Sequence, residues 1–172
     1  MKKILFNVLA LTILVSISSC TSYEDKEYGP VDFEVAFEGG DDWLFEGPIE
    51  AIKTIPFNPE DYGFSKENVG GMRLKSLTIN TENSHGFGIF ENMKVEVSSP
   101  NTDMLTIGVL NAVEDGNTLT IEGLEEAKIK NFNQVDEFFL HISGNLTQEL
   151  EESFEITGTF TLLVESSDKD EE

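Results

Sequence analysis

The chain has 172 residues, of which 33 are acidic and 11 basic, and its formal net charge is −22 at pH 7. A surface this negative would repel the phosphates of nucleic acids and anionic lipid headgroups, so we exclude nucleic acid as a partner. A single cysteine cannot form a disulfide within the chain. The stability of the domain must therefore come from its apolar core.

Residues 1–19 have the pattern of a secretory leader. Lys2 and Lys3 provide a positive start, and residues 4–17 form a mostly apolar stretch. This stretch is shorter than the roughly 20 apolar residues needed to cross a bilayer. It therefore indicates a signal peptide rather than a membrane span.

Ile17, Ser18, Ser19 and Cys20 directly follow that stretch. An aliphatic residue and two small residues before a cysteine resemble the lipobox of bacterial lipoproteins, although that family more often has leucine in place of Ile17. The resemblance implies cleavage before Cys20, which would then carry a thioether-linked diacylglycerol and an N-acyl chain. Several acyl chains anchor more stably than one myristoyl chain, whose binding is marginal. An ordinary secretory leader with a cysteine there by chance is the alternative.

The residues after Cys20 bear on the protein's location. Thr21 stands where an aspartate retains well-studied Gram-negative lipoproteins in the inner membrane, so the resemblance implies the outer membrane. Glu24 and Asp25 are similar to the short acidic signal that exports Bacteroidota-type lipoproteins to the cell surface, but a solvated tether has the same composition. We expect residues 20–30 to form a lipidated, flexible tether.

Apolar and polar residues alternate through residues 31–165, which predicts one domain of β-strands. The clearest strands are 31–37 and 154–164, in which every second residue is apolar or glycine. Shorter runs of the same kind predict further strands at 51–55, 73–80, 93–97, 104–113, 118–121 and 138–142.

Turn and breaker residues predict how some strands are placed and connected. Pro48 and Pro56 bracket the strand at 51–55 and favour an edge position, because proline cannot donate a ladder hydrogen bond. Residues 115–117, Asp-Gly-Asn, predict a tight hairpin between the strands that flank them. Residues 124–131 fit either one helical turn or a crossing loop.

Many short alternating strands need a second sheet to cover their apolar faces. We therefore predict an all-β fold, an antiparallel two-sheet β-sandwich of the immunoglobulin-like or jelly-roll-like kind, with about seven to nine strands. The domain also resembles small Bacteroidota-type surface lipoproteins that have a β-sandwich. Residues 166–172 are polar and acidic, so we expect them to form a disordered tail.

The two histidines give little support to metal binding or catalysis. His85 lies among turn residues, and His141 is expected on the polar, solvent-facing side of its strand. Neither has a second histidine at metal-ligand spacing, so we predict no zinc or copper site. The Gly-x-Ser-x-Gly motif of serine hydrolases is absent, and neither histidine is tied to an acid by sequence. We predict no catalytic residue and no cofactor.

One segment contains the candidate binding residues. Glu38, Asp41 and Asp42 could supply oxygen ligands to calcium, although the spaced Asp-x-Asp-x-Asp-Gly pattern is missing and a solvated strand end is the alternative. Trp43 could offer a flat aromatic surface to a ligand. Its alternative is to begin a strand and pack in the core with Phe45.

Taken together, these patterns predict a lipid-anchored lipoprotein of the cell envelope, at the outer membrane or exposed on the cell surface. Its partners would be the bilayer, through acylated Cys20, and a protein or a glycan. We expect it to act as a non-catalytic binding module rather than as an enzyme. A structural accessory subunit of an envelope complex is the alternative, and a hydrolase with an unfamiliar arrangement of residues ranks third.

Overall fold

The computed structural model describes residues 23–39, 43–63, 65–100, 102–130 and 135–167. Within these residues the chain forms eight strands: β1 (Glu24–Phe37), β2 (Gly47–Pro56), β3 (Val69–Asn80), β4 (Phe90–Ser99), β5 (Thr102–Leu110), β6 (Thr118–Glu122), β7 (Glu137–Leu146) and β8 (Phe154–Ser166). Short 3₁₀ helices lie at Pro59–Tyr62, Lys66–Asn68 and Gly86–Ile89. No helix in this part of the chain is long and apolar enough to span a membrane.

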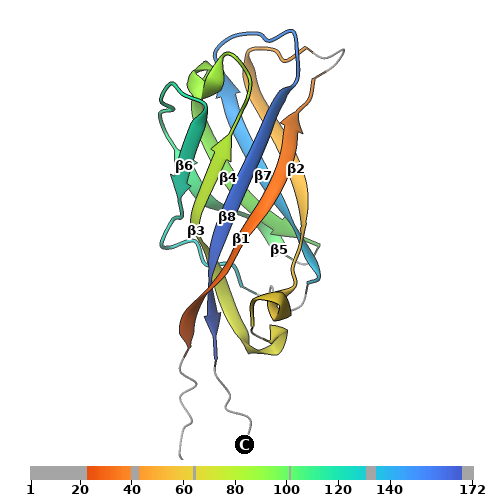
Figure 1. Cartoon of the computed structure of the whole chain (residues 1–172), viewed down its shortest axis with the longest axis vertical. Coiled ribbons are helices and arrows are strands. Elements are labelled where there is room, and N and C mark those ends of the chain that lie inside the picture. Colours follow the sequence, from red (N-terminus) through yellow and green to blue (C-terminus); the bar gives the residue numbers. More distant parts are fainter. Residues whose placement is uncertain (1–22, 40–42, 64, 101, 131–134, 168–172) are drawn as a thin grey trace, which may run out of the picture.

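The strands form two antiparallel sheets of four strands each, with the orders β1-β8-β3-β6 and β2-β7-β4-β5 (Figure 1). This arrangement confirms the predicted all-β fold and is consistent with a two-sheet sandwich. The expected edge position of the strand between Pro48 and Pro56 is also confirmed, because β2 is the first strand of its sheet.

The flexible tether expected up to Pro30 is wrong from Glu24 onward, because β1 begins there. Strand β8 extends to Ser166 and pairs with the start of β1. The pairing runs from Glu24 opposite Ser166 to Tyr28 opposite Leu162. Tyr28 is only 2% exposed, and its ring lies 5.2 Å from that of Phe57. Polar neighbours hid this strand from the alternation pattern. Cys20 lies outside the described residues.

The start of the predicted acidic tail belongs to the domain instead. Ser166 is the last residue of β8, and both Ser166 and Ser167 are buried. The backbone amide of Ser167 donates to the carbonyl oxygen of Asn68 at 2.9 Å, which fixes this end of the chain against the 3₁₀ helix that precedes β3. Residues 168–172 lie outside the described part of the chain.

The tight hairpin predicted at 115–117 is wrong, because β5 and β6 belong to different sheets. The connection crosses between the sheets and binds the segment after β3. The amide of Phe87 donates to the carbonyl of Gly116 at 2.7 Å, and that of Thr81 to the carbonyl of Asn117 at 3.0 Å. Gly116 does have a positive φ of 150°, so a turn forms at the predicted glycine even though it does not connect two paired strands.

Of the two readings of residues 124–131, the crossing loop is observed for Leu124–Lys130. Met72 and Ile129 form an isolated antiparallel bridge, with N–H···O distances of 2.9 and 2.7 Å. Ala127 and Ile129 are buried, so this loop covers one side of the core.

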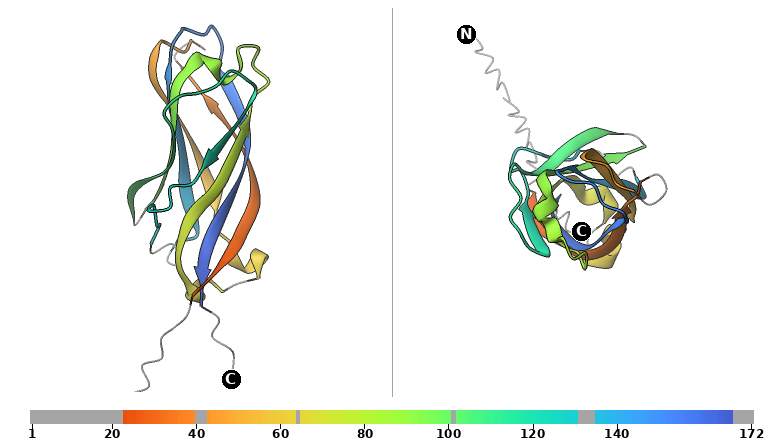
Figure 2. Two further views of the ribbon diagram at one scale, coloured as in Figure 1. Left: turned by 90° about the vertical axis from the view of Figure 1, so that its left-hand side faces the viewer. Right: turned by 90° about the horizontal axis from the view of Figure 1, so that it is seen from above.

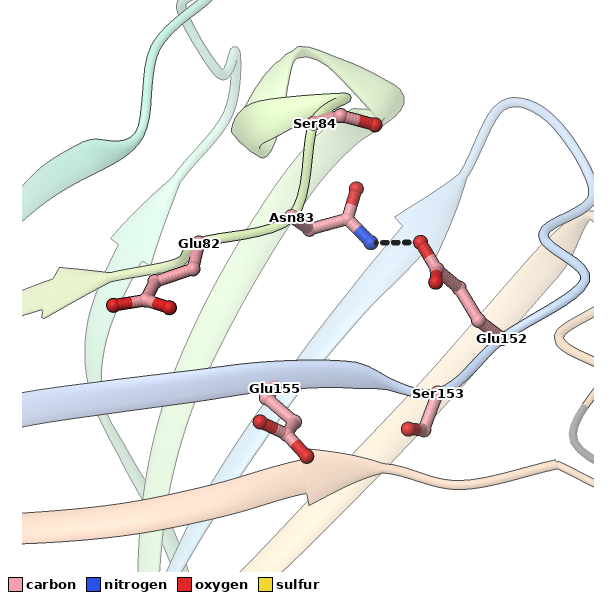
Figure 3. Close-up of a pocket in the computed structure, with 6 residues that line it drawn as sticks. All are labelled: Glu82, Asn83, Ser84, Glu152, Ser153 and Glu155. Carbon is pink, nitrogen blue, oxygen red and sulfur yellow. Dashed lines mark hydrogen bonds between the residues drawn. The ribbon is translucent and has the colours of Figure 1, made fainter.

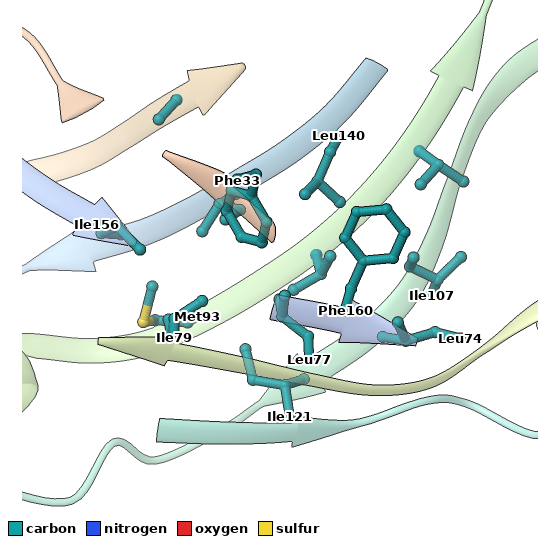
Figure 4. Packing of buried hydrophobic residues seen from close by; sticks show 14 of the residues in the cluster. Phe33, Leu74, Leu77, Ile79, Met93, Ile107, Ile121, Leu140, Ile156 and Phe160 are labelled. Carbon is teal, nitrogen blue, oxygen red and sulfur yellow. The ribbon is translucent and has the colours of Figure 1, made fainter. Parts of the chain in front are cut away.

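The inward-facing residues of both sheets meet in one apolar core, part of which is shown in Figure 4. Phe87, Phe90 and Phe154 pack edge to face or tilted, with ring centroids 5.2 to 6.3 Å apart. Such geometry adds to the free energy gained by burying the rings. Gly158 faces inward opposite Phe33, and a Cβ there would lie 2.4 Å from the end of the Phe33 ring. Glycine thus makes room for this ring over β8.

The elongated sandwich has two ends, which differ in what they contain (Figures 1 and 2). The start of β1 and the end of β8 lie side by side at one end, where Glu24 pairs with Ser166. The opposite end, here called the far pole, consists of residues 43–46, 81–89, 111–117 and 147–153. A chain attached through its N-terminal segment would hold the far pole away from the point of attachment.

Candidate functional site

Two exposed aromatic residues stand at the far pole. Leu44 forms an isolated bridge with Leu150, in which each amide donates to the other's carbonyl at 2.9 Å. Both leucines are buried. Because side chains alternate along an extended chain, burial of Leu44 turns Trp43 and Phe45 outward, and they are 38% and 61% exposed. The alternative, in which Trp43 begins a strand and packs in the core with Phe45, is therefore wrong.

A hollow of about 460 Å³ also lies at the far pole (Figure 3). It is lined by Glu82, Asn83, Ser84, Glu152, Ser153 and Glu155. Asn83 Nδ2 donates to Glu152 Oε1 at 2.7 Å. Thr81 fixes the loop behind them, since its Oγ1 donates to the carbonyl of Glu155 and accepts from the amide of Asn83. The hollow presents carboxylate, amide and hydroxyl groups to solvent.

The aromatic residues and the hollow share one supporting segment. Residues 147–153 contain Leu150, which anchors Leu44, and Glu152, which lines the hollow. His85 belongs to the same pole, where its Nδ1 lies 3.3 Å from Nε2 of Gln148. Hydrogen bonds between loops thus tie the parts of the far pole together.

The calcium prediction at Glu38, Asp41 and Asp42 stays a prediction. Glu38 is exposed, whereas Asp41 and Asp42 lie outside the described residues. Among the residues that the structure does describe, no group of three or more histidine, cysteine, aspartate or glutamate side chains is placed to hold a metal ion.

A second candidate site crosses the outer face of the β2-β7-β4-β5 sheet. His141 Nδ1 lies 2.9 Å from Glu50 Oε1, and His141 Nε2 lies 2.8 Å from Ser98 Oγ. The three residues come from β7, β2 and β4, which are adjacent strands. His141 does lie on the outer face, as expected, but it is only 7% exposed. The expectation of a solvated histidine is therefore wrong, because neighbouring side chains on both adjacent strands cover the ring.

The hydrogen-bond roles in this group follow from its chemistry. An ionised carboxylate can only accept, so His141 Nδ1 donates to Glu50. In the neutral ring Nε2 is then the acceptor, and it receives the hydroxyl proton of Ser98. Hydrogen bonds therefore link a carboxylate, an imidazole and a hydroxyl group in the same order as in the catalytic triad of serine hydrolases.

Sequence reasoning missed this group because its members are distant along the chain. His141 is 91 residues from Glu50 and 43 from Ser98. Alternation places all three side chains on outer faces, but only the order β2-β7-β4 brings them together. That strand order does not follow from the apolar pattern.

Glu96 lies next to this group, opposite His141 on β4. Burial raises the pKa of its carboxyl group, but hydrogen bonds from Lys94 and Thr106 and the charge of Lys94 outweigh that effect and leave the pKa below its usual value. Lys94 Nζ and Thr106 Oγ1 each lie 2.8 Å from a Glu96 oxygen. The outer face therefore holds an ionised carboxylate that is nearly buried.

Comparisons with known proteins leave the family of the chain open. No family model matches the chain, and no curated protein matches it. Solved structures similar to it include a Stig cyclase, Fisc, from Fischerella sp. TAU, in complex with (3Z)-3-(1-methyl-2-pyrrolidinylidene)-3H-indole. The match has a TM-score of 0.34 and 12% identity, and covers 89% of this chain and 93% of that one. A likeness at this level carries no argument about function.

Proposed function

We propose that the protein is a lipid-anchored lipoprotein of the cell envelope, at the outer membrane or on the cell surface, whose sandwich binds a glycan through the far pole. The observation that carries the binding site is the outward orientation of Trp43 and Phe45, fixed by the buried Leu44–Leu150 bridge. Rigidly presented aromatic side chains give large contact area at little entropic cost.

The choice of a glycan rests on the chemistry around these residues. An aromatic ring can pack against the apolar face of a sugar, while the acceptors of the hollow at the same pole can bind sugar hydroxyl groups. Glu82, Glu152 and Asn83 provide such acceptors. Many binding proteins have their contact residues on the loops of a rigid scaffold. Binding of a glycan at the far pole would involve no chemical reaction.

Attachment through Cys20 rests on the lipobox resemblance and is tested separately. We expect intact-mass spectrometry of the native protein to find a chain that begins at Cys20 with acyl chains attached. The Cys20→Ala variant should leave the membrane fraction. Native protein with an unmodified residue 20, or with that residue removed along with the leader, would overturn the anchor but not the binding site.

Binding is tested on a glycan array with the purified protein and the Trp43→Ala and Phe45→Ala variants. We expect each variant to lose about tenfold or more in affinity for the glycans that the wild type binds, as is typical of a central aromatic contact. The matched control is Met104→Ala, which removes an exposed apolar side chain from β5. Absence of reproducible glycan binding by the wild type, or equal loss in the control, would contradict the proposal.

An accessory subunit of an envelope complex is the second candidate. It is favoured by Ile52, which is 53% exposed on edge strand β2. A partner subunit docked on β2 should co-purify with the protein in mild detergent. It should no longer co-purify with the Ile52→Ser variant. Recovery of the native protein as a free monomer would remove this candidate.

A further inference from the structure

We propose that Ser98 is a nucleophilic serine, activated by His141 and positioned through Glu50, that takes an acyl group from reactive esters. This activity lies on a sheet face and is distinct from binding at the far pole. Nothing in the chain's motifs indicates it, because the nucleophile stands on a strand rather than at a sharp turn.

The strand register shows how the group is assembled. His141 on β7 stands opposite Ile52 on β2 and Glu96 on β4. Glu50 lies two residues before Ile52, and Ser98 lies two residues after Glu96, so each shares the outer face with His141. The three side chains therefore form a diagonal line across three strands. Diagonal neighbours of this kind lie within reach of long side chains.

The exposure of the three groups suits a reaction at Ser98. The His141 side chain is 9% exposed, whereas that of Glu50 is 44% exposed, so solvent reaches the carboxylate more readily than the ring. Ser98 is half-buried, which leaves its hydroxyl group partly accessible. A ring held on one side by a carboxylate and on the other by the hydroxyl is oriented as a general base for that hydroxyl.

Two carboxyl groups lie near the His141 ring. Glu50 accepts from Nδ1, and the ionised carboxyl group of Glu96 stands opposite His141 on β4, where Lys94 partly compensates its charge. Negative charge near an imidazole stabilises the imidazolium ion that forms when Ser98 loses its proton. Glu50 and Glu96 thus lie on the two sides of the ring that takes the proton in the proposed reaction.

The position of Ser98 sets the class of substrate. Strand β4 is internal, between β7 and β5, so most of its backbone amides serve the two ladders rather than an oxyanion, although the register with β5 shifts between Val97 and Ser99. The ester must therefore be activated by its own leaving group, as in aryl esters and thioesters, and amides should not react. Exposed Ile52 opposite His141 and Phe139 opposite Ser98 offer apolar contacts to an acyl or aryl group.

The proposed reaction has two steps, acylation of Ser98 and hydrolysis of the acyl-serine. Ser98 Oγ bonds to the acyl carbon while its proton passes to His141 Nε2. The bond from that carbon to the leaving group then breaks, and the leaving oxygen or sulfur takes the proton from Nε2. This gives an acyl-serine and a free phenol or thiol. Water then attacks the acyl-serine by the same proton path, releasing a carboxylic acid and restoring Ser98.

The test is labelling of the full chain with a fluorophosphonate, in which Ser98 Oγ bonds to phosphorus and fluoride leaves. Intact-mass and peptide mass spectrometry should find one adduct, on Ser98. Ser98→Ala should give none, and His141→Gln should label about 100-fold more slowly or worse, as expected for loss of a general base. The matched control is Ser143→Ala, which alters another half-buried serine on the same sheet face and should label like the wild type.

The proposed positioning role of Glu50 is tested by locating the proton on the His141 ring, which a purely structural residue would not change. In the wild type, nitrogen NMR of the His141 ring should show the proton on Nδ1. In Glu50→Gln the side-chain amide can donate instead, so we expect the proton to move to Nε2 and labelling of the folded variant to fall. Two results would overturn the proposal. One is that the folded wild type gives no Ser98 adduct under conditions that fully label a known serine esterase, and the other is that His141→Gln is labelled as fast as the wild type. Trp43→Ala should be labelled normally, so the outcome of this test does not depend on the outcome of the glycan test.

Discussion

The outer faces of the two sheets are built on the same alternating pattern but hold very different polar groups. The face of β1-β8-β3-β6, here called the threonine face, contains a cross-strand row of Asp32, Thr159, Thr78 and Thr120. These side chains are exposed or half-buried. The face of β2-β7-β4-β5, here called the relay face, contains His141 and Glu96, both at least nine-tenths buried.

The contrast shows that an outer face is not necessarily a solvated one. The polar side chains of the threonine face, including the charged pair Arg73–Asp25, stay at least partly exposed. On the relay face, polar neighbours from the same and adjacent strands cover His141 and Glu96. Buried polar groups of this kind cost free energy unless each has a partner. In the described part of the chain every buried side-chain nitrogen and oxygen has one.

The largest expected effect comes from removing the centre of the relay face. His141→Leu keeps the approximate volume but deletes two hydrogen bonds, and we expect the free energy of unfolding to fall by about 1–3 kcal/mol. The matched change on the threonine face is Thr159→Val, which deletes one bond to Asp32. There we expect a loss of about 0.5 kcal/mol or less, since solvent can replace the partner.

Urea denaturation of both variants measures this difference. Equal losses in the two variants would mean that the relay face is no more protected from water than the threonine face. A larger loss for Thr159→Val would reverse the comparison.

A smaller effect is expected in the pH dependence of stability. Because the folded pKa of Glu96 lies below its ordinary value of 4.5, the charged carboxylate stabilises the fold above that pH. The stabilisation is lost as the pH falls through the folded pKa. We therefore expect Glu96→Gln to melt below the wild type at pH 7 and the gap between them to close below about pH 4.5.

Thermal melts of the two proteins between pH 7 and pH 3 test this prediction. Lys94→Met provides the control, because removing the main partner of Glu96 should reduce the pH dependence of the gap. A gap that widens on acidification would show that burial, rather than hydrogen bonding, sets the ionisation of Glu96.

Much of this fold could be predicted from local pattern, because each strand has one apolar side. The strands around Phe33 and Phe160 and the edge position of β2 between its prolines all follow from that pattern. The start of β1 did not follow, since Glu24–Glu27 contains no apolar residue and is held by pairing with β8. The sheet crossing after β5 depends on which inner faces must be covered, which local residues do not specify.

The candidate sites were less predictable than the fold, for a related reason. Trp43 could be identified as a candidate by its residue type, but its outward orientation depends on the bridge between Leu44 and Leu150, which are 106 positions apart in the numbering (150 − 44). The meeting of Glu50, His141 and Ser98 likewise depends on strand order. Burial of a polar residue on an outer face becomes visible only when its neighbours on adjacent strands are known.

The smallest effect is expected from the ion pair between Arg73 and Asp25 at the edge of the threonine face, whose charged atoms lie 2.5 Å apart. Both side chains are partly exposed, so a double-mutant cycle with Arg73→Ala and Asp25→Ala should give a coupling of about 0–1 kcal/mol at low salt. Salt should remove that coupling, because the Debye length falls to about 3 Å at 1 M. A coupling that persists at high salt would mean that this face, too, shields its charges. If the coupling is small while amide exchange at the start of β1 stays slow in both variants, the pairing with β8, and not the ion pair, holds this segment of the strand to the domain.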